Sequence, residues 1–217
     1  MPCKAVAEKK QTQTVPPYPL KIIVPEKCSE ELRYVVRVIF DEFWGVPYDL
    51  RVAAQAHVSI SAEDSEWRVT IDSDFFSGAS RNWLGSESLP RLPLNSLLTG
   101  DHEFLKDLDF TELPILFGSP QLMRSANLIE VKFDILGAIF FMLTRYEEYL
   151  EHDKDEHDRF QESSSIGHKA RFQATPIVNQ YLEVLWRVLK SAGFSLERRP
   201  RSFKVEPTCD LDLPFDP

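Results

Sequence analysis

The pattern of apolar and polar positions begins with a short apolar run at residues 20–25, "LKIIVP", which predicts a buried strand ended by proline. Ser29 is the expected N-cap of a following helix, because two glutamates come directly after it and the helix dipole favours carboxylates in the first turn. Apolar residues then recur at helical spacing up to Phe43, before a glycine and a proline. The start of the chain therefore predicts a strand followed by a helix.

Four more segments have the pattern of strands: residues 48–52, 57–61, 67–71 and 113–118. The third alternates strictly between apolar and polar residues, which is the period of a half-buried strand. Together with the first strand, these segments predict a mixed β-sheet flanked by helices. The expected fold class is therefore α/β, with α+β as the alternative.

Two later helices are predicted from their caps. Asp134 precedes a pattern that runs to Leu150, and the first two turns of this pattern are apolar nearly all round, so that end is expected to be deeply buried. Thr175 and Pro176 give a cap and a first-turn proline for the second helix. Residues 75–109 are rich in proline and glycine and predict a long ordered loop region.

Composition and charge exclude some of the classes to which this protein could belong. A chain of 217 residues with 43% hydrophobic residues can bury a core, which excludes a disordered protein. The net charge of −9 argues against a nucleic-acid partner, since little basic surface is left over. The leader at residues 1–18 is polar, and no run reaches the ~20 apolar residues of a membrane span. Three widely spaced cysteines favour a reduced compartment, so we expect a cytoplasmic protein without a membrane partner.

The last segment of the sequence, "RSFKVEPTCDLDLPFDP", raises the question of catalysis. Residues 201–208 have the pattern of a strand, and Asp210 and Asp212 follow it. At the end of a barrel strand, one such carboxylate could hold a divalent metal while the other takes a proton from bound water. The alternative is a solvated acidic segment with turn-forming prolines, and the pattern alone favours this alternative.

A charged run at residues 144–160 contains His152 and His157. Five helical residues rotate by about 500°, which leaves the two rings roughly 140° apart and unable to share a metal ion on one helix. We expect instead an ion-pair network that either ties the helix end to the next loop or faces a neighbouring domain. Its members are Arg145, Glu147, Glu148, Asp155 and Arg159.

Four segments in order, "FDILGAIFFMLTRYEEYL", "KDEHDRF", "PIVNQYLEVLWRVL" and "PTCDLD", resemble a domain of unassigned function. That domain precedes the catalytic domain in a group of bacterial polysaccharide-deacetylase-family proteins. The resemblance covers residues 19–213. It implies a flexible leader at residues 1–18, an accessory α/β domain at residues 19–200, and the first strand of a deacetylase-like barrel within residues 201–217.

By this resemblance, Asp210 would be the catalytic base and Asp212 a ligand of a divalent metal, with zinc expected in the complete protein. Cys209 stands where that group has histidine, and none of the five histidines forms a His-x-x-x-His pair. The resemblance therefore implies a non-catalytic accessory domain of a protein that removes N- or O-acetyl groups from carbohydrate. The barrel would be its partner. The alternative is a stand-alone binding or scaffold module of unknown function.

Overall fold

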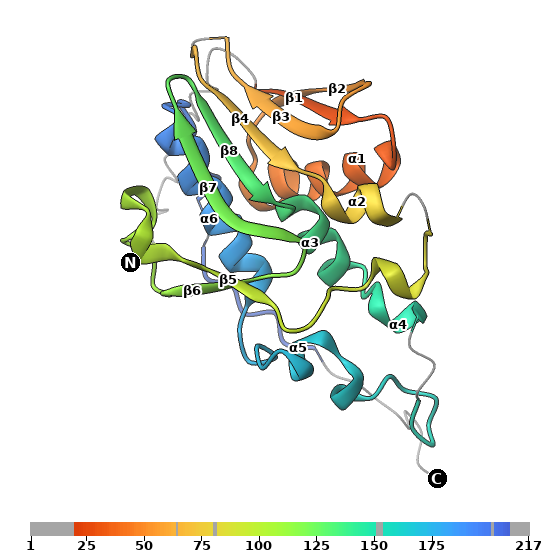
Figure 1. Ribbon diagram of the computed structural model, residues 1–217. Helices are drawn as coiled ribbons and strands as arrows, with labels where there is room; N and C mark the ends of the chain where they lie inside the picture. Colours follow the sequence, from red (N-terminus) through yellow and green to blue (C-terminus); the bar gives the residue numbers. More distant parts are fainter. Residues whose placement is uncertain (1–19, 64, 80–81, 151–153, 201, 209–217) are drawn as a thin grey trace, which may run out of the picture.

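A mixed β-sheet with helices packed on it forms the body of the protein in the computed structural model, which describes residues 20–63, 65–79, 82–150, 154–200 and 202–208 (Figure 1). Within these residues the sheet has six strands in the order β2-β1-β3-β4-β8-β7, and β5 and β6 form a separate pair. The strands are β1 Leu20–Pro25, β2 Tyr48–Ala53, β3 His57–Ser61, β4 Arg68–Asp72, β5 Asn95–Leu98, β6 Glu112–Ile115, β7 Gly118–Ser125 and β8 Leu128–Phe133.

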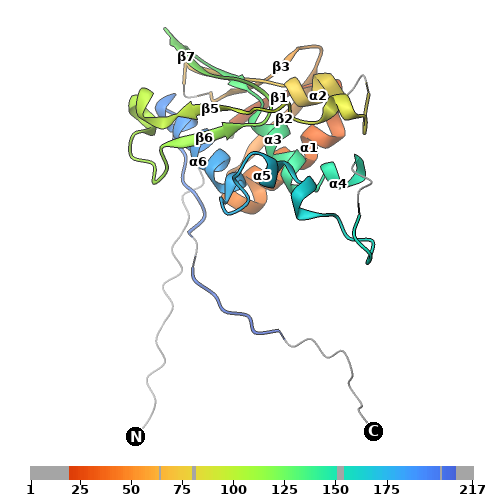
Figure 2. The same ribbon diagram turned by 60° about the horizontal axis from the view of Figure 1, so that its bottom comes forward.

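The helices connect these strands and pack mainly on one side of the sheet (Figure 2). They are α1 Ser29–Arg37, which continues as a π-helix over Val38–Trp44, then α2 Asp74–Ala79, α3 Ile135–Leu143, α4 Glu147–Leu150, α5 Ile166–Lys169 and α6 Ile177–Ser191. The expected α/β class and mixed sheet are thereby confirmed. No helix in the described part of the chain is both long and apolar enough to cross a membrane.

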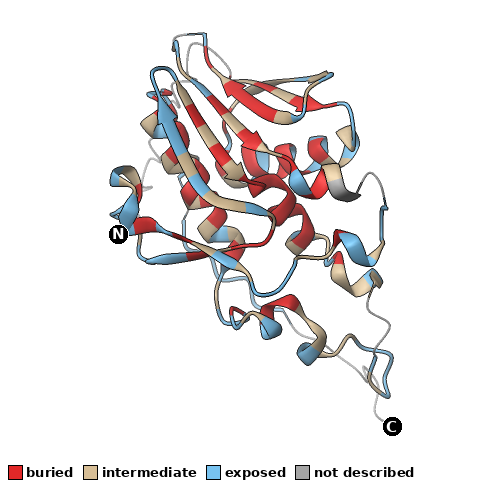
Figure 3. Ribbon diagram, viewed as in Figure 1, coloured by how far each residue is buried: buried red, intermediate tan, exposed pale blue. Residues whose placement is uncertain are grey.

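The core lies between the sheet and α1, α3 and α6 (Figure 3). Alternate residues of the central strands face it, so that Ile22 on β1, Val69 on β4 and Val131 on β8 are fully buried, whereas their sequence neighbours face the other side. Every residue of α3 from Ile135 to Phe141 is buried. The deep burial predicted from its all-round apolar sequence is confirmed.

Local patterns located the first four strands to within one residue, but helix boundaries needed correction. The N-cap of α1 is Cys28, with a left-handed φ of 54°, and Ser29 is already helical because Leu32 N–H donates to the Cys28 carbonyl. The N-cap of α6 is Pro176, so this helix also begins one residue away from the expected position. Such shifts matter little for the fold.

The helix expected to run from residue 135 to Leu150 was wrong in its second half, since α3 ends at Leu143. The hydroxyl of Thr144 donates to the Phe140 carbonyl, and Arg145 adopts a left-handed φ of 53°. Tyr146 N–H then bonds the Phe141 carbonyl, which terminates the helix before the short α4 begins. Local hydrogen bonding therefore overrides a continuous apolar pattern here.

The strand predicted at residues 201–208 has no partner strand in its described part. Residues 202–208 have no regular secondary structure, and every one of them is exposed. By contrast, the segment just before them is held to the domain: Arg198 pairs with Glu183 and lies 4.2 Å from the Trp186 ring centroid, and Arg199 N–H donates to the Trp44 carbonyl. The contacts of the folded unit therefore extend to Arg199.

Gly137 is expected to be essential for the contact between α2 and α3. A Cβ at this position would lie 2.6 Å from Phe75 Cβ and 2.5 Å from an Asp134 carboxylate oxygen. We predict that Gly137→Ala lowers the free energy of unfolding by about 1–3 kcal/mol in urea titrations, since overpacking outweighs the helix propensity of alanine. The matched control is Gly100→Ala, because nothing lies within 4 Å of its Cβ position. Stabilisation by Gly137→Ala would contradict this packing.

Candidate functional site

One edge of the sheet collects the ends of four strands. β1 pairs with β2 and β4 pairs with β8 in parallel, and β3 is antiparallel to both β1 and β4, so β1, β2, β4 and β8 all point the same way. Their carboxyl ends therefore share an edge, where α1, α2 and α3 begin. In open α/β sheets, ligands bind at such an edge. This edge is therefore the expected position of a functional site.

Asp134 organises this edge by capping two helices at once. Its Oδ1 accepts a hydrogen bond from Gly137 N–H at 2.6 Å in the first turn of α3. Its Oδ2 accepts from Phe75 N–H at 3.1 Å in the first turn of α2. The residue is 1% exposed, and this burial raises the pKa of its carboxyl to about 8, while the N–H donors act in the opposite direction. Its contacts are with backbone groups, so we assign it a positioning role.

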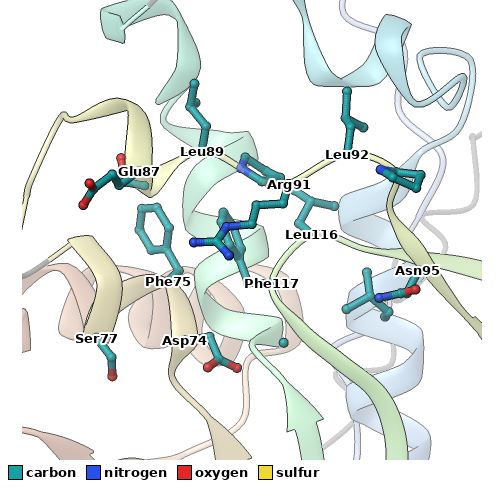
Figure 4. A pocket seen from close by; sticks show the side chains of 15 residues that line it. Asp74, Phe75, Ser77, Glu87, Leu89, Arg91, Leu92, Asn95, Leu116 and Phe117 are labelled. Atoms are coloured by element: carbon teal, nitrogen blue, oxygen red, sulfur yellow. The ribbon is translucent and has the colours of Figure 1, made fainter.

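A pocket of about 580 Å³ opens beside α2, between this helix, residues 87–95 and the turn from β6 to β7 (Figure 4). Buried or half-buried apolar side chains form its floor, among them Phe75, Leu116 and Phe117. Its polar lining includes Asp74, Ser77, Glu87, Arg91 and Asn95.

Two opposite charges face this pocket from different elements. Asp74 lies at the start of α2, and in Figure 4 the Arg91 guanidinium reaches into the space above it. Burial, together with repulsion from Asp72, raises the pKa of the Asp74 carboxyl. Within the described residues no ion pair is found for either side chain.

The wall next to Asp74 depends on a glycine. Gly118 opens β7 with a φ of +89°, a conformation that other residues rarely adopt. A Cβ there would lie 2.7 Å from an Asp74 carboxylate oxygen and 2.6 Å from the Lys132 carbonyl. The backbone of β7 can therefore pass close to the carboxylate only because this residue has no side chain.

A second pocket, of about 480 Å³, lies on the other side of α2 at the ends of β1 and β2. Ser73 lines it; this residue is 4% exposed, and its hydroxyl has no hydrogen-bond partner among the described residues. Asp134 takes the capping bond that a serine in this position would ordinarily make. Gln55 is fixed nearby by bonds to the Ile23 and His57 carbonyls. The pocket offers this hydroxyl and an amide, and Glu26 and Lys27 add one charge of each sign to its lining.

The residues that the sequence singled out do not line either pocket where they fall in the described chain. Asp210 and Asp212 are outside the described residues, as is His152. Of the expected ion-pair network, Arg145 pairs with Glu148 beside α4, and Asp155 pairs with Arg159 at 2.8 Å in the following loop.

Glu147, another expected member of that network, accepts a hydrogen bond from Ile166 N–H at 2.7 Å and so holds the start of α5. Nothing in the described chain groups three or more histidine, cysteine or acidic side chains in a way that could hold a metal ion.

Sequence reasoning missed Asp74 and Arg91. A signal for Asp74 was present in the sequence. Asp72-Ser73-Asp74 has the same Asp-x-Asp spacing at the end of a correctly predicted strand as Asp210-Leu211-Asp212 has at the end of the last predicted strand. Arg91 carried no such signal, since it lies in a proline-rich stretch without periodicity.

Most of the chain matches the model of a known protein family. Residues 20–193 match a family of unknown function, DUF7033. The chain belongs to this family. The match covers the sheet and its helices and ends just after α6, so the DUF7033 unit includes both pockets. Neither the curated proteins nor the solved structures contain a significant match to the chain.

Asp134 is expected to be the most sensitive polar residue at this edge. We predict that Asp134→Ala lowers the free energy of unfolding by about 2–4 kcal/mol in denaturant titrations, because the change leaves buried N–H donors of two helices without an acceptor. Asp134→Asn should fall in between, since its amide retains one acceptor oxygen. The control is Asp107→Ala, an exposed aspartate expected to stay within about 0.5 kcal/mol of the parent. Equal stability of all three variants would exclude the double cap.

Proposed function

We propose that this chain is the non-catalytic N-terminal accessory domain of a polysaccharide deacetylase-like protein. The catalytic barrel, which would remove N- or O-acetyl groups with the help of a divalent metal, would lie on polypeptide that follows. The proposal rests on the ordered motifs that resemble such proteins and on one structural observation, the uncovered segment at residues 202–208.

This segment has the side-chain pattern of a strand without the neighbours of one. Phe203 is 93% exposed and Val205 is 69% exposed, whereas Lys204 and Glu206 form an ion pair with each other. Residues two apart share a face in an extended chain, so the apolar pair and the charged pair point to opposite sides. The segment runs away from the sheet and helices (Figure 2). These features are what a strand would show before another unit covers its apolar side.

The chemistry of the complete protein is assigned by resemblance. Asp210 would act as the base and Asp212 would bind the metal, for which zinc is expected. Zinc sites use three or four protein ligands, and the described residues contain no such group. The remaining ligands would therefore come from outside the described part, and Cys209 would stand beside the site where related proteins have histidine.

The second candidate is a stand-alone binding module. The 580 Å³ pocket favours it, because its volume is typical of ligand sites and its charged groups have no ion-pair partner within the described chain. Ligand binding by the pocket is also compatible with the first candidate, since the pocket lies on the DUF7033 unit and the exposed segment lies beyond it.

The accessory role predicts that the 217-residue chain has no deacetylase activity of its own. Incubation with zinc and an N-acetylated oligosaccharide should release no acetate above background, with an active deacetylase as the positive control. Turnover by this chain that is lost in Asp210→Ala would overturn the proposal. So would a downstream reading frame without β/α units and a His-x-x-x-His pair.

The exposed segment gives a second prediction. In the 217-residue chain, Phe203→Ser should leave the melting temperature unchanged within about 1 °C, because the side chain contacts almost nothing. In a chain extended through the barrel, the same change should lower the melting temperature by several degrees, since it would remove a buried side chain. Phe194→Ser, at a residue 1% exposed, should destabilise both chains. An equal and negligible effect of Phe203→Ser in both would show that no further unit covers it.

A further inference from the structure

The pocket beside α2 holds opposite charges that do not neutralise each other. Asp74 and Arg91 come from two walls of the pocket, and Figure 4 shows the guanidinium above the carboxylate. Neither has an ion-pair partner within the described chain. Glu87 adds a second carboxylate at the rim, and Asn95 adds an amide. The pocket therefore presents a guanidinium donor and separate acceptors around an apolar floor.

This arrangement excludes several ligand classes. A phosphate or polyanion would meet two carboxylates in a chain of net charge −9. A bare metal ion would lack a third protein ligand in the described residues. A simple cation would lie close to Arg91, and a purely apolar molecule would leave these charged groups desolvated without partners. A ligand that carries both signs of charge matches these side chains.

We propose that this pocket binds a small zwitterion of the α-amino acid or short-peptide class, with its carboxylate on Arg91 and its ammonium group on Asp74. A guanidinium binds a carboxylate through two parallel hydrogen bonds, which fixes the orientation as well as the charge. Phe75, Leu116 and Phe117 would contact the side chains of the ligand. The volume of 580 Å³ leaves room for more than one residue, so a peptide fills the pocket better than a single amino acid.

The state of Asp74 fits this assignment. Partial burial and the neighbouring Asp72 raise the pKa of the Asp74 carboxyl, which means that both disfavour its ionised form. An ammonium group within hydrogen-bonding distance would stabilise the ionised form. The inference does not depend on the deacetylase-like partner, because every residue involved lies within the DUF7033 unit.

The test is calorimetric titration of the 217-residue chain with L-alanyl-L-alanine, with its N-acetyl derivative, which lacks the ammonium group, and with its C-terminal amide, which lacks the carboxylate. Free L-alanine distinguishes a peptide site from an amino-acid site. We expect each blocked derivative to bind about ten-fold more weakly or worse than the dipeptide. Tighter binding of the dipeptide than of alanine would assign the site to peptides, and the reverse to amino acids, and either supports the proposal.

Single substitutions test which residue binds the carboxylate of the ligand and which binds its ammonium group. The Arg91→Gln variant should bind the dipeptide and its C-terminal amide equally well, but it should still prefer the dipeptide to the N-acetyl derivative. The Asp74→Asn variant should bind the dipeptide and the N-acetyl derivative equally well, but it should still prefer the dipeptide to the amide. Arg171→Gln is the matched control, since Arg171 is an exposed arginine that does not line this pocket. Melting temperatures of all variants would confirm folding.

Three results would overturn the proposal: no binding by any of the four compounds at millimolar concentration, binding that ignores both substitutions, or binding of a neutral disaccharide such as chitobiose that requires Asp74 and Arg91.

Discussion

Asp134 holds together the starts of α2 and α3 at the carboxyl edge of the sheet. Its carboxyl group accepts a hydrogen bond from Gly137 N–H, three residues later, at the start of α3. It also accepts one from Phe75 N–H, 59 residues earlier, at the start of α2 on the same edge of the sheet. Because the group is buried, losing it leaves N–H donors that water cannot reach. Gly137 allows this close packing, since any side chain there would push Phe75 and Asp134 apart.

The position of α2 in turn determines what surrounds it. With its first turn held by Asp134, the helix presents Asp74 to one pocket and leaves the Ser73 hydroxyl beside the other. Gly118 brings β7 against the Asp74 carboxylate and closes the first pocket on that side. A capping interaction thus sets the geometry of the pocket without lining it, as supporting residues do in many binding sites.

The DUF7033 unit and the segment after it suggest separate tasks. The unit has its own core. After it, Arg198 pairs with Glu183 and contacts the Trp186 ring, and Arg199 N–H donates to the Trp44 carbonyl. Beyond it, Phe203 and Val205 have no apolar cover among the described residues. A folded unit with a charged pocket, followed by an uncovered strand-like segment, agrees with an accessory domain that recognises a small ligand next to a second unit.

The sequence by itself determined the elements whose signals are local: strands β1–β4, the buried start of α3 and its cap Asp134, and hence the α/β class. The end of α3 was not predictable from periodicity, because the Thr144 hydroxyl and the left-handed Arg145 end the helix inside an apolar pattern. Only the tertiary structure decided that Asp134 also caps α2 and that Arg91 faces Asp74. Those contacts join segments far apart in the chain, and they depend on strand order and register, which a one-dimensional pattern does not record.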